Sequence, residues 1–516
     1  MKEHRVIVIG AGLGGLSAAA HLAKSGFHVD VFERHHTPGG YANSFVRDGF
    51  EFDASLHALS GIGPEGNRGP CYRLLEACGV AQKIQFLPIK EFYASVFPDF
   101  RATIPFGWEA AEEAYCRQFP HERKGIKRLM RFMRNMFKEM KIITGEPHTL
   151  DLITFPLRGR HVIRSAGLTL AQAMDREISE PGLKALFCSV WGYYGLPPSR
   201  LSFLLFALAN ANYIEYGPYH IKGTSQALAN AFVAAIEENG GTVHLRSGVK
   251  KIEVSGHTVT GILTEHGDWF PADYIVCNAN PIHCCYDLIG PGKVPVRYLN
   301  GLGEGHIAVS TFNVYLGLDC RAEDLGLVTH ELFVSESYDL DEHYRAMFRI
   351  GRQKYYVITT YNASDPDFSP AGTAAVVLTG LHDYDAWSRI PPERYVETKN
   401  RMAAEMIEAA DEIVPGIRKH IVVMEVATPI TNMRYTGNPG GSILGFDYDL
   451  TGSPMLRLSN RGPLKGLFFA NAWVRLGGGY EPCITSGFLA CTDIIKDARG
   501  PGVLGKMISQ ISIIPG

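Results

Sequence analysis

A continuous apolar run opens the chain, and its pattern predicts the first strand of a parallel sheet. Residues 6–9 read Val-Ile-Val-Ile, and four successive apolar side chains are typical of a strand that is buried on both faces. A glycine-rich turn and an alanine-rich helix to about Lys24 follow, and Gly26 ends the helix. Residues 29–32 predict a second strand, so the pattern indicates a strand–helix–strand unit.

The glycines of that turn have the G-x-G-x-x-G spacing of a dinucleotide-binding unit. Gly10 permits a tight turn, Gly12 lets the backbone approach a pyrophosphate, and Gly15 lets helix and strand pack closely. Glu33 ends the second strand, where an acid can accept hydrogen bonds from ribose hydroxyls and favours FAD or NAD over NADP. Because all these features occur in order, we predict a dinucleotide site and not a glycine-rich turn without a ligand.

The remaining pattern is largely helical at first and then strand-rich. Helices are expected at 71–78, over most of 108–215, and at 225–238, 394–413 and 483–496. Strands are expected within 91–105 and at 242–245, 249–254, 259–263, 269–270, 272–280, 308–316, 354–360, 373–378 and 466–473. The segment 249–270 reads as an antiparallel meander, whereas 272–280 and 466–473 read as further strands of the parallel sheet.

One predicted helix, residues 123–141, combines an apolar stripe with a dense positive charge. Ile126, Met133 and Phe137 recur at helical spacing, and lysines and arginines occupy most of the other positions. Such a helix can lie on an anionic membrane surface as a peripheral contact. The alternative is a solvated lid helix whose methionine face packs in the core.

Composition and charge restrict the class of protein. The 516 residues suffice for two or more domains, 46% of them are hydrophobic, and the net charge of −3 gives no reason to propose a nucleic-acid partner. Ten cysteines without C-x-x-C spacing fit reduced thiols better than disulfides or a zinc site, so no metal is predicted. We find no signal peptide and no run of about 18 apolar residues. We therefore expect a cytoplasmic protein, with membrane association as an option.

The residues after Glu33 distinguish FAD from NAD. The segment 38–44 brings a second glycine pair soon after the acid, which resembles the FAD-binding pattern of the glutathione-reductase-like flavoproteins. The segment 49–57, Gly-Phe-Glu-Phe-Asp-Ala-Ser-Leu-His, is similar to one subfamily: the phytoene desaturases, carotenoid isomerases and retinol saturases. Further segments match the same family in order, and the resemblance spans nearly the whole chain: 272–280, 365–372, 428–431 and 440–445.

The resemblance implies FAD as the cofactor and a set of residues that bind it. The helix after the turn 477–482 would point its positive end at the flavin N1–C2=O edge, and Val249 would meet the adenine through its backbone. Ala472 departs from the family pattern, because many relatives carry an acid there. The implied cofactor-binding residues are Gly10, Ala11, Gly12, Gly14, Gly15, Glu33, Arg34, Gly39, Gly40, Tyr41, Ala42, Val249, Asn471, Ala472, Gly478 and Gly479.

The implied fold class is α/β. A discontinuous glutathione-reductase-like FAD-binding Rossmann domain is expected at 1–65, 220–290 and 460–500. A helical substrate and lid region is expected at 66–219, a mixed α+β substrate domain at 291–459, and a C-terminal tail at 501–516. Because we find no second complete G-x-G-x-x-G unit, electrons would pass between FAD and an external donor or acceptor.

The implied activity is an oxidoreductase reaction on carbon–carbon double bonds of a long apolar polyene or isoprenoid. Such enzymes saturate, desaturate or isomerise a lipophilic substrate, with hydride exchange at flavin N5. His57 is expected near the flavin, either as a proton donor or as a histidine that fixes a loop. Glu481 and Tyr480 are candidate acid and positioning groups, although helix capping is a simpler role for Glu481, and Asp53 is expected to brace a loop.

Two other classes stay open at this point. A flavin amine oxidase or monooxygenase would share the fold, and an amine oxidase would need an aromatic cage, for which Trp473 and Tyr480 are candidates. A non-catalytic flavin-binding protein is the third class. Reduction or reoxidation of bound flavin by an apolar substrate would separate it from the enzymes.

Overall fold

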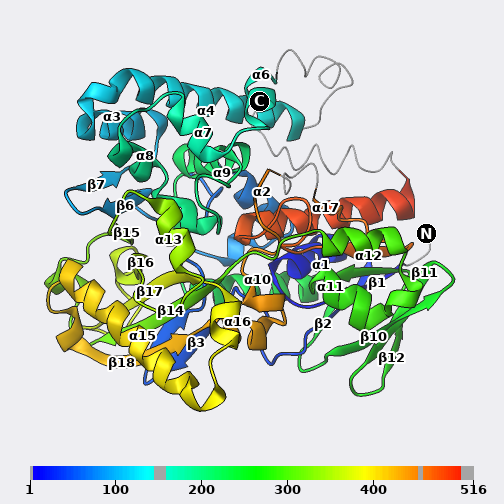
Figure 1. Cartoon of the computed structure of the whole chain (residues 1–516). Coiled ribbons are helices and arrows are strands. Elements are labelled where there is room, and N and C mark those ends of the chain that lie inside the picture. The colour runs from blue at the N-terminus through cyan, green and yellow to red at the C-terminus, as the bar shows by residue number, and fades with distance from the viewer. Residues whose placement is uncertain (1–3, 145–158, 451–456, 501–516) are drawn as a thin grey trace.

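The computed structural model describes residues 4–144, 159–450 and 457–500, and its elements form a mixed α/β fold. Three regions lie beside one another in Figure 1: a helical region in cyan and teal at the top, a large sheet at the lower left, and a parallel sheet with its covering helices at the right. The chain leaves the parallel-sheet region after its first strands and returns to it twice, in green and in red.

The smaller sheet is parallel throughout and contains the strand predicted at 6–9. Its order is β19 (Leu467–Phe469), β13 (Tyr274–Cys277), β1 (Arg5–Ile9), β2 (His28–Phe32) and β9 (Thr242–His244). Val6 and Val8 belong to the core that this sheet forms with α1 (Leu13–Lys24), α10 (Thr224–Glu238) and α17 (Tyr480–Arg499). Ile7 and Ile9 belong to the core shared with the antiparallel strands β10 (Val249–Ser255), β11 (Thr258–Thr264) and β12 (Trp269–Pro271). Both faces of β1 are therefore covered, which accounts for its unbroken apolar run.

The larger sheet has seven strands from distant parts of the chain. Its order is β18 (Ile421–Ala427), β14 (Ser310–Leu318), β17 (Ala374–His382), β16 (Tyr355–Thr360), β15 (Glu331–Ser335), β6 (Tyr93–Val96) and β7 (Arg101–Ile104). Neighbouring strands are antiparallel except β15 and β6. The helix α15 (Pro392–Ile413) packs on one face through a core that includes Phe312, Leu378 and Met406. The pairing of β15 with β16 sets Glu331 opposite Thr359.

The helical region contains the basic amphipathic helix as α4 (Arg123–Thr144). Its other helices are α3 (Trp108–Gln118), α6 (Arg160–Ser165), α7 (Leu170–Asp175), α8 (Pro181–Phe187) and α9 (Phe203–Tyr216). Ile126, Met133 and Met136 of α4 are buried in the core that these helices share with the large sheet. Ion pairs of its basic residues include Arg123–Glu113, Lys127–Glu112, Arg128–Glu177 and Arg134–Glu109. The methionine face thus packs inward, as the lid-helix interpretation expects.

Shorter elements connect these regions. They are β3 (Ser44–Arg47), β4 (Phe50–Asp53), α2 (Pro70–Ala77), β5 (Phe86–Pro88), β8 (Tyr219–Ile221), α11 (Pro281–His283), α12 (Val296–Gly303), α13 (Leu340–Ala346), α14 (Tyr384–Ser388) and α16 (Pro429–Thr436).

The structure corrects several predicted bounds. The helix expected from 483 begins at Tyr480, so 480–482 form its first turn and not a separate tight turn. The strand expected at 373–378 continues to His382, because it pairs along its whole length with β14. All ten cysteines are free thiols, as predicted. No helix in the described part of the chain has the length and apolarity needed to cross a membrane. The predicted tail 501–516 lies outside the described residues.

Candidate functional site

One cavity of about 1010 Å³ extends between the three regions. Its lining includes every candidate site residue of the sequence analysis except Ala11 and Gly15. The candidates come from β1–α1, the segment after β2, the loop after β4, the start of β10 and the segment before α17. The fold therefore brings together residues that lie up to several hundred positions apart in sequence.

The glycine turn after β1 is too crowded for side chains. Gly10 has a φ of +93°, which favours glycine, and a Cβ on Gly15 would lie 2.2 Å from the Gly10 carbonyl oxygen. A Cβ on Gly12 would lie 2.4 Å from Asn278 Oδ1, and one on Gly14 would lie 2.2 Å from the Ala470 carbonyl oxygen. Gly15 thus has the packing role expected of it. A glycine is also required at position 12, because a Cβ there would collide with Asn278 Oδ1.

Asn278 is a site residue that the sequence analysis did not single out. It follows β13, and its Oδ1 accepts a hydrogen bond of 3.1 Å from the Gly12 amide. Its Nδ2 donates to the Ala470 carbonyl at 2.6 Å. This side chain joins the three chain segments that meet at the carboxyl ends of β1, β13 and β19. A polar residue directly after a buried parallel strand was the available signal.

Glu33 ties the end of β2 to the same turn. Its carboxylate accepts hydrogen bonds from the Ala11 amide at 2.8 Å and from the His35 amide at 2.9 Å. The next residue, Arg34, extends the other way and donates to the Tyr435 carbonyl at 3.1 Å. The second glycine pair lies beside the turn, because the Gly39 amide donates to the Ala11 carbonyl at 2.7 Å. These contacts place the carboxylate and both glycine turns along one wall of the cavity.

This wall has the features that a flavin nucleotide requires. The helix α1 begins after Gly12 without a side-chain cap or an acid in its first turn, so its N-terminus can face a pyrophosphate. The helix α17 also begins at the cavity, after Gly479. A Cβ on Gly478 would lie 2.7 Å from the Leu444 Cα, so backbone and not a side chain must line this turn.

The remainder of the cavity is an apolar chamber formed by the helical region and the large sheet. Among the described residues that these two regions contribute to the lining, none carries a charge at neutral pH. We define the apolar chamber by Phe137, Met140, Tyr193, Tyr194, Leu205, Leu208, Ala209, Tyr213, Tyr216, Phe333, Tyr355, Val357, Leu381, Ile443 and Leu444. An extended hydrophobic molecule could bury its surface here without removing water from a charged side chain of the protein.

His57 lines the cavity where the loop after β4 meets the large sheet. Its Nδ1 forms a hydrogen bond of 2.7 Å with Thr359 Oγ1, and the side chain is 19% exposed. Burial, with a smaller contribution from His330, lowers the pKa of His57 to about 4, so the ring is neutral at physiological pH. The bond to Thr359 fixes the loop to the sheet, and the rest of the ring is left to face the cavity.

Tyr480 and Glu481 open α17 at the cavity wall. The Tyr480 hydroxyl donates to Ser225 Oγ at 2.8 Å, and burial raises its pKa well above the usual value. Glu481 accepts hydrogen bonds from the Ser60 hydroxyl and from Asn212 Nδ2, the latter at 2.6 and 2.8 Å. Burial also raises the pKa of Glu481. These partners lie outside α17, so the carboxylate binds the helical region and the loop after β4 and not the amides of its own helix.

Asp53 has the bracing contacts expected of it. It is 1% exposed and accepts hydrogen bonds from the Ser225 amide and hydroxyl at 2.8 Å and from the Leu56 amide at 3.1 Å. The carboxylate thus holds the loop that carries His57 against the start of α10.

The family model for flavin-containing amine oxidoreductases matches residues 13–495. This chain belongs to that family. The family is defined by its flavin, so the predicted cofactor, FAD, and the predicted class, an oxidoreductase, are confirmed.

Curated relatives of this chain support the subfamily resemblance. The all-trans-retinol 13,14-reductase of Danio rerio is 26% identical over 95% of this chain and 85% of its own. The 4,4'-diapophytoene desaturase of Methylomonas sp. is 25% identical over 83% of this chain and 82% of its own. The 4,4'-diapolycopene oxygenase of Methylomonas sp. is 27% identical over 96% of this chain and 99% of its own.

Solved structures share the fold of this chain. An oxidoreductase from Methanosarcina mazei has a TM-score of 0.64 at 17% identity, over 95% of this chain and all of its own. A putrescine oxidase has a TM-score of 0.62 at 15% identity, over 96% of this chain and 99% of its own. At these identities the likeness extends to the fold alone.

Proposed function

We propose that this protein is a FAD-dependent oxidoreductase that acts on carbon–carbon double bonds of a long apolar polyene of carotenoid or retinoid type. The apolar chamber carries the proposal, because it opens onto the glycine-lined wall and contributes no charged side chain among its described residues. The retinol reductase and the diapophytoene desaturase among the relatives support the same substrate class. Four reactions on such a substrate are to be distinguished. They are saturation, desaturation, isomerisation and, because one relative is an oxygenase, oxygenation.

In this proposal the parallel sheet and its helices form a discontinuous, glutathione-reductase-like FAD-binding domain. The predicted segments 1–65, 220–290 and 460–500 would bind FAD, 66–219 would cover the substrate, and 291–459 would form the sheet beneath it. The two turns would hold the pyrophosphate, with Glu33 at the ribose and the backbone of Val249 at the adenine. Bound FAD would supply hydride exchange with the substrate.

The protein's own side chains would orient the substrate and exclude water. The aromatic rings of the apolar chamber would stack against the polyene and keep its reacting bond beside the wall. Tyr480 and Glu481 would hold α17 at the lid and the loop after β4, and His57 would hold the other end of that loop. The electron donor or acceptor would be external.

An amine oxidase needs a place for an ammonium group, and the contacts do not favour one. Glu481 is already bound by Ser60 and Asn212, and Trp473 packs edge-on against Phe446 at 4.9 Å. Its indole nitrogen donates to Asn438 Oδ1 at 3.3 Å, and Tyr480 is bound to Ser225. Both candidate cage residues are therefore fixed by contacts within the protein.

A comparison of polyenes with amines as reactants tests the proposal. Purified holoenzyme would be mixed without oxygen with retinol, phytoene or a cis-carotenoid in detergent, and separately with putrescine and cyclohexylamine. We expect a polyene to change the flavin absorbance of either the oxidised or the dithionite-reduced protein, and amines to leave it unchanged. Reduction by an amine, with no response to any polyene, would contradict the proposal and favour an amine oxidase.

A further inference from the structure

A buried carboxyl group, that of Glu331, lies behind the apolar chamber and does not line the cavity. Glu331 is the first residue of β15, and 3% of its surface is exposed. Its Oε2 shares a hydrogen bond with the hydroxyl of Tyr193, which lines the chamber. Its Oε1 lies 3.5 Å from His57 Nδ1 and has no hydrogen-bond partner among the described residues.

The surroundings of Glu331 offer no compensating positive charge. The cross-strand neighbour is Thr359, whose hydroxyl is bound to His57. The acid Glu91 lies on the far side, where it accepts from the His330 amide at 2.9 Å. The other titratable groups that face Glu331 are His57, His330, Tyr193, Tyr213, Tyr355 and Tyr361. In the described part of the chain, no lysine or arginine forms an ion pair with Glu331.

A buried carboxyl with these neighbours is held in its neutral form. Burial, and to a lesser extent the charge of Glu91, raises the pKa of Glu331 to about 8. At pH 7 the group therefore carries a proton, whereas His57 at a pKa of about 4 does not. In the structure the Tyr193 hydroxyl donates to Glu331 Oε2. A proton on that carboxyl lets the hydrogen bond reverse, so that Glu331 donates to the Tyr193 oxygen and the Tyr193 hydrogen turns towards the chamber.

We propose that Glu331 and Tyr193 form a proton relay that opens into the apolar chamber. The inference rests on the proposed function. Saturation of a double bond adds a hydride, which the reduced cofactor supplies, and a proton, which the protein must supply. Tyr193 gives its hydroxyl proton to the second carbon, Glu331 gives its carboxyl proton to the Tyr193 oxygen, and the Glu331 carboxylate regains a proton from water. The substrate gains two hydrogens and the relay returns to its starting state.

In this relay Tyr193 contacts the substrate, and Glu331 is a positioning residue that acts through it. His57 lies 3.5 Å from the carboxyl and Thr359 lies opposite it on β16, and neither carries the proton. Glu331 takes the place of His57 as the source of the proton, because burial lowers the pKa of His57 and raises the pKa of Glu331.

The protonation state can be measured without turnover. Infrared difference spectra of the holoenzyme, recorded from pH 6 to 10, would report the carbonyl stretch of a protonated buried carboxyl. We expect a band at pH 7 that is lost with a midpoint near pH 8, is absent from Glu331→Gln and persists in a control variant. No such band in the wild-type protein would overturn the relay.

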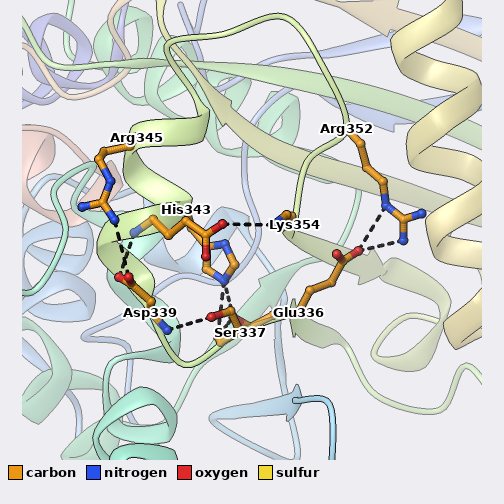
Figure 2. A network of polar contacts seen from close by, with 9 residues as sticks. Glu336, Ser337, Asp339, His343, Arg345, Arg352 and Lys354 are labelled. Carbon is orange, nitrogen blue, oxygen red and sulfur yellow. Dashed lines mark hydrogen bonds and ion pairs between the residues drawn. The ribbon is translucent and has the colours of Figure 1, made fainter.

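Glu336→Gln is the matched control, because Glu336 follows the same strand on its solvent side. Figure 2 shows Glu336 paired with Arg352 in a surface network that also includes Asp339, Arg345 and Lys354, and the Glu336–Arg352 distance is 2.8 Å. This variant removes one carboxylate from the end of β15 without touching the chamber.

The relay is then tested in a single turnover of dithionite-reduced holoenzyme with the reactive polyene in D₂O. We expect Glu331→Gln and Tyr193→Phe to slow flavin reoxidation by about 100-fold and to abolish its decline above pH 8, while Glu336→Gln behaves like the wild type. One carbon-bound deuterium from solvent is expected in the product. Wild-type rates in both variants, or a product without solvent deuterium, would overturn the relay while the proposed function stands.

Flavin content and the thermal midpoint are measured for each variant, and Tyr193→Phe keeps the test valid if Glu331→Gln does not fold. If the wild-type protein reacts with no polyene in either redox state, the proposed function fails and the relay fails with it. The infrared band still reports whether Glu331 holds a proton.

Discussion

At the scale of single residues, a few side chains hold the backbone turns that surround the cavity. Glu33, Asp53 and Asn278 all accept hydrogen bonds from backbone amides of loops that carry site residues. Such acceptors matter because a buried amide that loses its hydrogen-bond partner stays desolvated, which destabilises the folded state. Glu33 could be predicted from its position after the second strand. For Asn278 only the position after a strand could be predicted. Its hydrogen bonds could not, because its partners Gly12 and Ala470 are remote in sequence.

Asp53→Asn should destabilise the fold by about 1–3 kcal/mol, because an amide cannot accept all the bonds that the carboxylate receives from Ser225 and Leu56. Asp48→Asn in the exposed turn between β3 and β4 is the matched control, with an expected change below about 0.5 kcal/mol. Denaturant unfolding of the two holoenzymes gives the difference. Equal stability of both variants would show that Asp53 does not brace the loop.

Asn278→Ala should weaken flavin binding by about tenfold, which corresponds to about 1.4 kcal/mol. The variant leaves the Gly12 amide and the Ala470 carbonyl without their partner, so the turn that we propose to hold the pyrophosphate loses its support. The flavin dissociation constant can be measured by fluorescence after removal and re-addition of FAD. Asn300→Ala on the exposed side of α12 should bind flavin like the wild type, and unchanged binding in both would contradict the assignment.

At the scale of elements, local patterns predicted most helices and strands, and long-range pairing determined the rest of the site. The strands at 249–254, 259–263 and 272–280 and the helix at 225–238 follow from periodicity and glycine stops, and the structure has them within a few residues. The parallel pairing of β15 with β6 joins positions more than 230 residues apart, and nothing in either segment marks its partner. Glu331 and Tyr193 could not be predicted from the sequence, because neither lies in a recognisable motif and their contact depends on long-range pairing.

The packing of α4 leads to a prediction about membranes. Its apolar face is buried, so any attachment would rest on exposed basic side chains such as Lys124, Arg131 and Lys138. We expect weak binding to anionic vesicles that is lost in molar salt, where charges are screened beyond about 3 Å. The triple variant to glutamine should abolish it in a sedimentation assay, and neutral vesicles should not bind. Salt-resistant binding would indicate insertion of an apolar surface and contradict this packing.

At the scale of the whole molecule, the buried histidines determine how stability responds to acid. Burial lowers the pKa to about 4 in His21, His57, His330 and His382 and to about 3 in His220. The unfolded chain binds protons at these groups below about pH 6.5 while the folded chain does not, so stability falls as the pH falls from 6.5 towards 4. Burial also lowers the pKa of His343, which makes six such histidines among the described residues. The raised pKa values of five carboxyl groups act in the opposite direction; these are Asp53, Glu331, Asp383, Asp447 and Glu481.

The thermal midpoint should therefore fall between pH 7 and pH 4.5. His220→Phe should make that fall shallower, because both ring nitrogens of His220 are buried without a partner among the described residues and its ring packs against Phe368. Calorimetry of both proteins across this range measures the effect. A variant that loses stability as steeply as the wild type would show that His220 takes no part in the acid response.

In the proposed function, the flavin exchanges hydrogen with a polyene held in the apolar chamber. The most direct test is the mass of the product formed when retinol, phytoene or a cis-carotenoid meets the holoenzyme in either redox state without oxygen. We predict a gain of two hydrogens with the reduced protein, a loss of two with the oxidised protein, or a changed geometry at constant mass that requires reduced flavin. A parallel reaction in air would reveal a gain of oxygen. If every polyene is recovered unchanged under all of these conditions, the proposed function is contradicted.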